Sequence, residues 1–168
     1  MIISSFGKGP LKLSQIKDAA AASPYPSTIT LAGLDTSITD VNVQLLGLTH
    51  TWPDDIDVLL VGPQGQNLII MSDAGGSTDV NNINLTLDDS AAQALPDSTA
   101  LASSVYRPTN YGIGDTFPAP APGPSSATTL ATFNGTNPNG TWSLYVVDDA
   151  SGDVGNLSGG WCLNVVAS

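Results

Sequence analysis

The chain contains no glutamate, and all 15 of its acidic residues are aspartate. Glutamate favours helices, whereas aspartate favours helix caps, turns and loops. The chain also has 17 glycines and 12 prolines, which interrupt regular structure at many points. This composition predicts an all-β domain with many turns, and 168 residues are enough for one such domain with a full hydrophobic core.

Positive charge is scarce and confined to one end. Three of the four cationic side chains, Lys8, Lys12 and Lys17, precede Asp18. Residues 18–168 contain fifteen aspartates and one arginine, Arg107, so their net charge is −14. Such a surface repels nucleic acids and anionic membranes, so neither is an expected partner. It attracts hard cations that take oxygen ligands, although the same charge also serves solubility alone.

Cysteine and histidine occur once each, as Cys162 and His50. One cysteine excludes an internal disulfide, and this supply of ligands excludes a thiolate or imidazole zinc site. A Ser-His-Asp triad would have to use His50, which is expected instead to satisfy backbone groups at the end of a strand. Cys162 stands in an apolar strand and is expected to be buried and inert. The chain is therefore not expected to be an enzyme.

Long apolar runs are missing as well. No stretch of 18 apolar residues is present, so no transmembrane helix is expected. Residues 1–23 lack the apolar segment of a secretory signal. We therefore expect no membrane insertion. If the protein is exported, this chain is a mature form, an excised domain or the product of another export route.

The best-defined part of the sequence is the stretch 40–72, which predicts three consecutive strands. Val41, Val43 and Leu45 alternate with polar residues, as in a half-buried strand. The run 56–61 is apolar apart from Asp57, which predicts a strand buried on both faces. A turn at 63–66 then leads to an antiparallel strand over 67–71.

Further strands are expected over 27–34, 83–88, 129–133, 141–147 and 161–166. No helix is expected after residue 26. Together these segments predict an all-β fold, an antiparallel jelly-roll-like β-sandwich of about eight strands.

A long irregular segment, 89–127, contains Tyr106, Tyr111, Phe117 and a proline-rich run. A loop of this length is usually functional or held down by its own side chains. We expect the three aromatics to anchor it to the sandwich, with glycan binding as the alternative.

The first 26 residues differ from the rest in charge and composition. We expect residues 1–26 to form an N-terminal leader or interaction arm and residues 27–168 to form the sandwich. As an arm, the leader would dock on an acidic neighbour or add a strand to a sheet edge. As a plain leader, it would be a flexible tail.

Calcium is the cofactor that the aspartates favour, because it takes about six to eight oxygen ligands from loops. Three loops offer such ligands: the loop with Asp54, Asp55 and Asp57, the loop from Asp73 to Asp79, and the loop with Asp148, Asp149 and Asp153. The last of these is preferred because Gly152 and Gly155 permit tight turns. Turn capping by these side chains is the alternative. The candidate ligands of a structural calcium ion are Asp54, Asp55, Asp57, Asp73, Asp79, Asp148, Asp149 and Asp153.

Two stretches also carry a family resemblance. HTWPDDIDVLLVGPQG at 50–65 and FNGTNPNGTWSLYVVDDASGDVGNLSGGWCLNV at 133–165 resemble the P domain (P/Homo B domain) of the proprotein convertases, in the form attached to bacterial secreted proteins. The resemblance covers about residues 27–167. It implies a jelly-roll-like sandwich without catalytic residues, an extracellular or cell-surface location, and calcium binding in some members.

The expected function is a non-catalytic extracellular module, structural or accessory, of the kind attached to secreted subtilisin-like proteases and stabilised by calcium. Its partner would then be the neighbouring catalytic domain of a larger secreted protein. An alternative is a self-assembling surface or filament subunit, whose basic arm docks on copies of itself. A weaker alternative is a carbohydrate-binding module.

Overall fold

The structure is a computed structural model that describes residues 3–8 and 14–168. Its strands and two short 3₁₀ helices (η) follow one another along the chain in this order: β1 Ile3–Lys8, β2 Ser14–Ile16, β3 Ser27–Leu31, β4 Ile38–His50, η1 Pro53–Asp55, β5 Ile56–Val61, β6 Asn67–Ser72, β7 Val80–Leu87, β8 Ser104–Tyr106, β9 Thr109–Asn110, η2 Leu130–Phe133, β10 Gly140–Asp148 and β11 Gly155–Ala167.

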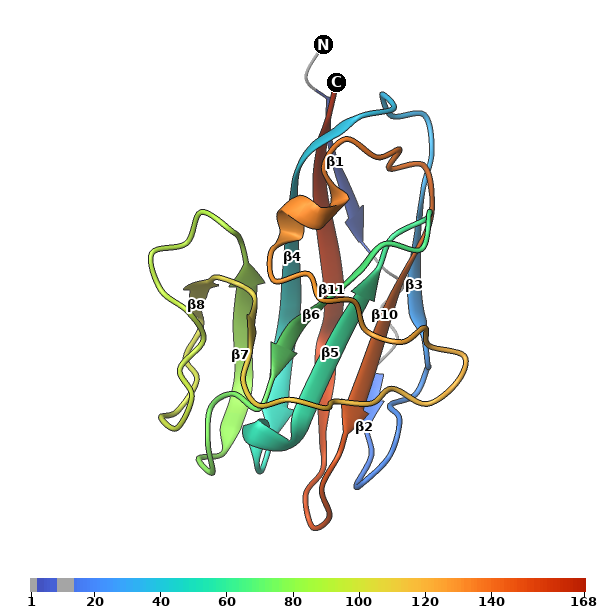
Figure 1. Cartoon of the computed structure of the whole chain (residues 1–168). Helices are drawn as coiled ribbons and strands as arrows, with labels where there is room; N and C mark the ends of the chain where they lie inside the picture. Colours follow the sequence, from blue (N-terminus) through green and yellow to red (C-terminus); the bar gives the residue numbers. More distant parts are fainter. Residues whose placement is uncertain (1–2, 9–13) are drawn as a thin grey trace.

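Two sheets pack face to face (Figure 1), which confirms the predicted all-β sandwich. One has the strand order β1-β11-β4-β7-β8, with β2 also paired to β11, and the other has the order β3-β10-β5-β6-β9. All long strands pair antiparallel, as expected. Among the strands of the described residues, only the short β8 and β9 pair parallel to their neighbours, β7 and β6. The sheets are therefore mixed at one edge each.

The three strands predicted over 40–72 are confirmed as β4, β5 and β6. The residues of β5 are buried except for the partly exposed Val61, so this strand is covered on both faces as predicted. The outer face of β5 is buried because a further layer of chain covers this sheet from outside the sandwich. Side chains of the long loop, which crosses β6, β5 and β10 in Figure 1, shield the outer face of that sheet.

Two expectations about secondary structure were wrong. Residues 129–133 do not form a strand, because Leu130–Phe133 is the 3₁₀ helix η2. The Asp89 carboxylate accepts hydrogen bonds from the backbone N–H groups of Leu130 and Ala131, at 2.9 Å each, and so holds the start of this turn. The last strand, β11, begins at Gly155 rather than at Trp161, because β4 and β2 supply backbone partners for its first residues.

Most of the described leader belongs to the sandwich. Both β1 and β2 pair antiparallel with β11, and residues 20–22 hydrogen-bond to the end of β10. Ile16 and Ala22 are buried in the core. The segment 14–26 therefore passes from the edge of one sheet to the edge of the other. The arm thus adds its strands to an edge of its own chain; residues 1–2 and 9–13 of the expected arm lie outside the described residues.

The main core fills the space between the sheets around the fully buried Trp142, Trp161 and Phe133. A smaller cluster lies on the outer face of the second sheet, where Phe117 packs on the strand residues Leu59, Ile69, Tyr145 and Val147. No helix among the described residues has the length and apolar character needed to cross a membrane.

The expected role of the loop aromatics is confirmed. Phe117 is buried in the outer cluster. The hydroxyl groups of Tyr106 and Tyr111 donate to the backbone carbonyls of Ala102 (3.0 Å) and Leu95 (2.6 Å). These two bonds tie the segment to itself, whereas Tyr106 in the main core, Tyr111 packed against that core and Phe117 in the outer cluster hold the segment on the sandwich.

Candidate metal centre

Asp57 is the most unusual side chain of the protein. Side chains alternate along a strand, so Asp57 shares the outer face of β5 with Leu59, and it lies opposite Val147 of β10. Only 1% of its surface is exposed. Neither carboxylate oxygen has a hydrogen-bond partner among the described residues. A buried carboxylate without partners is costly unless it is protonated or binds a cation.

Two further carboxylates meet Asp57. Asp73 directly follows β6, and Asp115 belongs to the long loop. One oxygen of each of the three aspartates lies within 4.8 Å of the others. The position of Asp115 follows from Phe117, because the packing of this ring on the outer face of the sheet brings the chain two residues earlier over Asp57.

Local geometry shapes the approach of the loop to Asp73. Asp73 itself has a φ of 49°, a left-handed conformation that aspartate tolerates better than most residues. Gly112 has a φ of 74°, and a Cβ atom there would lie 2.8 Å from Asp73 Oδ2. The absence of a side chain at residue 112 therefore lets the loop pass close to this carboxylate.

The electrostatics of the cluster disfavour three free negative charges. Burial raises the pKa of Asp57 to about 7, the Ser72 hydroxyl beside it opposes this rise by a smaller amount, and the nearby carboxylates Asp115, Asp149 and Asp73 raise this pKa further. Burial likewise raises the pKa of Asp73. Ser72 has one hydroxyl proton, and it donates this proton to Asp73 Oδ2 (3.1 Å), which leaves Asp57 unbonded. A bound cation would relieve both the burial and the repulsion.

This arrangement predicts an unusual pH dependence when divalent cations are removed by a chelator. The folded pKa of Asp57, about 7, lies above its ordinary value of 3.8, so the folded state holds its proton more tightly than the unfolded state. The stabilisation is fully present below pH 3.8 and is lost as the pH rises through 7. We expect a loss on the order of 4 kcal/mol.

Urea unfolding at a series of pH values with chelator present measures this loss. Asp57→Asn should make the fall shallower by this amount, because asparagine does not titrate, and the fall that remains should include that of Asp55, whose pKa burial raises to about 6. A wild-type curve that rises between pH 4 and 7 would contradict the placement of Asp57.

Asp148, the centre of the preferred sequence-based site, lies elsewhere and is occupied by hydrogen bonds. It is fully buried at the end of β10. Its Oδ2 is 3.2 Å from His50 Nε2, and its Oδ1 accepts from the backbone N–H groups of Ala19 (3.4 Å) and Ala150 (3.2 Å). His50 Nδ1 lies 2.9 Å from the backbone oxygen of Trp52 and 3.1 Å from its backbone nitrogen, so a protonated Nδ1 donates to that oxygen and an unprotonated Nδ1 accepts from that N–H, while Nε2 faces Asp148. The expected structural role of His50 is thus confirmed.

The other candidate aspartates surround the cluster or lie apart from it. Asp54 and Asp149 are near enough to raise the pKa of Asp73 by repulsion. Asp55 is 9% exposed and belongs to a separate pocket with Asp153, and Asp79 is exposed. Of the predicted ligands, the structure therefore brings together Asp57 and Asp73.

Sequence reasoning missed Asp115. It directly follows Gly114 in a loop whose sequence predicts no strand, and it is about forty residues from Asp73. Its distance from the anchoring Phe117 was the one available signal, and only the packing of that ring gives it meaning.

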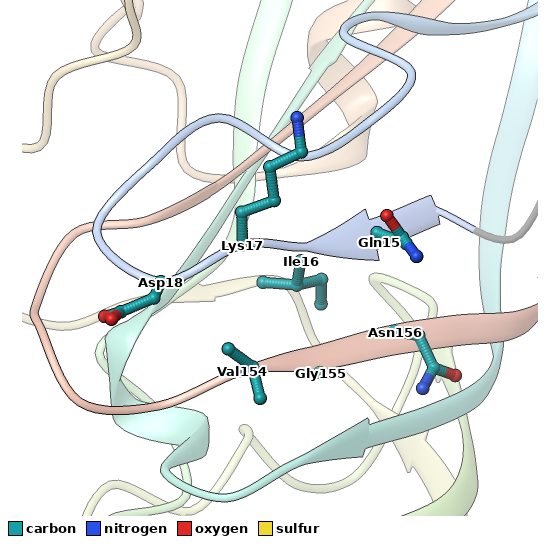
Figure 2. A pocket seen from close by; sticks show the side chains of 7 residues that line it. All are labelled: Gln15, Ile16, Lys17, Asp18, Val154, Gly155 and Asn156. Carbon is teal, nitrogen blue, oxygen red and sulfur yellow. The ribbon is translucent and has the colours of Figure 1, made fainter.

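A pocket of about 430 Å³ lies between β2 and the beginning of β11, lined in part by Ile16, Lys17 and Val154. Figure 2 shows that the side chain of Lys17 leads away from β11 rather than into a shared polar centre. The pocket therefore gathers no group of catalytic or ligating side chains.

No protein-family model matches this chain, and no curated protein matches it. Among solved structures, it is similar to the complex of the Aeromonas sobria serine protease with its chaperone (16% identity, TM-score 0.45), covering 99% of this chain and 26% of that one. It is also similar to the serine protease of Aeromonas sobria (14% identity, TM-score 0.45), covering 100% and 26%. The chain thus spans about a quarter of the length of both solved chains.

Proposed function

We propose that this chain is a non-catalytic β-sandwich module whose long loop is fixed by a calcium ion bound to Asp57, Asp73 and Asp115. The observation that carries the proposal is the carboxylate of Asp57, which is 1% exposed and has no hydrogen-bond partner among the described residues. A calcium ion at this point would bond to that carboxylate and offset two of the three negative charges of the cluster.

Calcium fits the donor set better than other common metals. Its bonds to oxygen are about 2.3–2.6 Å long, so oxygens on opposite sides of the ion lie up to about 5 Å apart. The spacing of at most 4.8 Å between the three carboxylates is within that span. Zinc prefers nitrogen and sulfur ligands, and the fully buried His50 is engaged with Asp148 and Trp52.

The bound ion would fix the position of the long loop 89–127. Asp57 belongs to a central strand, Asp73 ends the neighbouring strand, and Asp115 comes from the segment that crosses both. An ion held by all three fastens that segment to the outer face of the sheet beside the Phe117 anchor. We infer a structural ion rather than a catalytic one.

The wider role that we propose is an extracellular accessory module of a larger secreted protein, with its neighbouring catalytic domain as partner. Support comes from the P-domain-like stretches at 50–65 and 133–165 and from the sandwich that they form. An extracellular setting also suits the metal, because modules there bind calcium with dissociation constants of about 10⁻⁴–10⁻³ M.

Thermal melting in calcium and in EDTA at pH 7.5 tests the metal site. With calcium at about a hundred times the dissociation constant, we expect a stabilisation of about 2.7 kcal/mol. For a domain of this size this corresponds to a rise in Tm of roughly 5–10 °C. Titration calorimetry should show a stoichiometry of one.

Three variants make the test specific. Asp57→Asn and Asp115→Asn should abolish the calcium effect, and Asp57→Asn should also stabilise the protein in EDTA because it removes a buried charge. Asp35→Asn removes the same charge from the turn before β4 and should behave as the wild type. Equal melting of the wild type in calcium and EDTA, with no heat of binding, would refute the site.

A further inference from the structure

A second pocket, of about 320 Å³, lies at the same end of the sandwich as the candidate metal centre. It is lined by Trp52, Asp55, Ala150, Ser151 and Asp153. These residues come from two connections, the turn between β4 and β5 and the loop between β10 and β11. The pocket thus combines one aromatic ring with two carboxylates.

Trp52 is the exposed tryptophan of this protein. Its side chain is 43% exposed, whereas Trp142 and Trp161 are 0% and 1% exposed. Its backbone is fixed, because its N–H donates to the fully buried His50 ring (3.1 Å). The indole is therefore held outside the core at a defined place, and exposed aromatic rings beside a pocket are typical of binding surfaces.

The two carboxylates have unused acceptor capacity. Asp55 is nine-tenths buried, and among the described residues its carboxylate accepts no hydrogen bond. Asp153 Oδ1 accepts a hydrogen bond from Thr51 Oγ1 at 2.7 Å. Among the described residues, the one ion pair is that of His50 with Asp148, so no lysine or arginine of that part of the chain neutralises this pocket.

We propose that this pocket binds the guanidinium group of an arginine side chain presented by a protein partner. A guanidinium ion is planar, stacks on an indole face and donates in a fork to carboxylates. Asp55 and Asp153 would accept from it while Trp52 covers one face. The net charge of −14 after residue 17 would draw a basic partner segment toward the site.

The inference does not depend on the metal centre, because the two sites use different side chains. A calcium ion is a poor occupant here, since indole offers no oxygen ligand and only two carboxylates line the pocket. A lysine side chain could bind more weakly, as a point charge without the fork.

NMR titration with Nα-acetyl-L-arginine methylamide tests the proposal on the full chain. The indole N–H signal of Trp52 should shift with a dissociation constant in the millimolar range, while the buried Trp142 and Trp161 serve as internal references. The citrulline analogue, which is neutral and nearly identical in shape, should cause no shift. The lysine analogue should bind at least threefold more weakly.

Variants separate this pocket from the calcium site. Asp153→Asn and Trp52→Ala should weaken arginine binding at least fivefold and leave calcium binding unchanged. Asp57→Asn should do the opposite, and Asp35→Asn should change neither. Equal shifts with the citrulline analogue, undiminished binding by Asp153→Asn, or loss of calcium binding in that variant would each overturn the assignment.

Discussion

Replacing His50 with alanine should lower the free energy of unfolding by about 3–5 kcal/mol. The reason is the carboxylate of Asp148, which is 0% exposed and would lose the hydrogen bond from His50 Nε2 at 3.2 Å. Without His50, Oδ2 of this buried carboxylate has no hydrogen-bond partner among the described residues, whereas Oδ1 keeps the backbone N–H groups of Ala19 and Ala150. The effect is large because the pair joins β4 of one sheet to β10 of the other.

The residues around His50 are not expected to fill the space that its ring would leave. Gly155 lies opposite it in the sheet, and a Cβ atom at Gly155 would come within 2.5 Å of His50 Cδ2. The ring thus occupies a space made by a missing side chain, and alanine at residue 50 would leave a cavity as well as an unpaired charge.

Urea unfolding of a double-mutant cycle measures the interaction. The variant with both His50→Ala and Asp148→Asn should lose less stability than the sum of the single variants, because no buried charge is left. Asp153→Asn is the matched control in the same loop, and its exposed hydrogen bond to Thr51 should be worth at most about 1 kcal/mol. Additive losses in the cycle would mean that the two side chains do not depend on each other.

Deleting residues 1–23 should destabilise the protein strongly, which is the second large effect that we expect. The deletion removes β2 and the buried Ile16 and Ala22, and it exposes the backbone of β10 that residues 20–22 cover. Ile16→Ala alone should cost about 2–5 kcal/mol. The adjacent Lys17→Ala should change stability by no more than about 0.5 kcal/mol, because Lys17 is exposed.

The same deletion examines the assembly alternative. Size-exclusion chromatography with light scattering, on the full chain and on the deletion variant, reports the oligomeric state beside the stability. Oligomers of the full chain that disappear on deletion, without a loss of stability, would favour an arm that docks on other copies. A monomeric full chain at high concentration and low salt would exclude self-assembly.

The sequence by itself determined the fold class and much of the strand pattern. Alternation at Val41, Val43 and Leu45 and the apolar run of β5 are local signals, because side-chain period and turn chemistry depend on neighbours along the chain. The absence of glutamate and the many turn residues also indicate an all-β fold from the sequence alone. These features predicted a sandwich, and the aromatic residues Tyr106, Tyr111 and Phe117 predicted the anchoring of the long loop.

Only the tertiary structure decided which aspartates meet. Sequence alone hardly distinguishes the fifteen aspartates from one another. The three whose side chains meet come from a strand, the end of a strand and a loop. Their separation in space depends on the packing of Phe117 and on sheet pairing, neither of which sequence spacing encodes. The same holds for Asp148, whose partner His50 is 98 residues away.

The leader shows the same division. Its charge and weak pattern predicted a separate arm, because composition reports what a segment prefers on its own. Its place in the sandwich depends on the unpaired edge of β11, which exists only after both sheets have formed. Pairing at a sheet edge uses backbone groups and depends little on side-chain identity. The sequence of the leader therefore gave little indication of its pairing with β11.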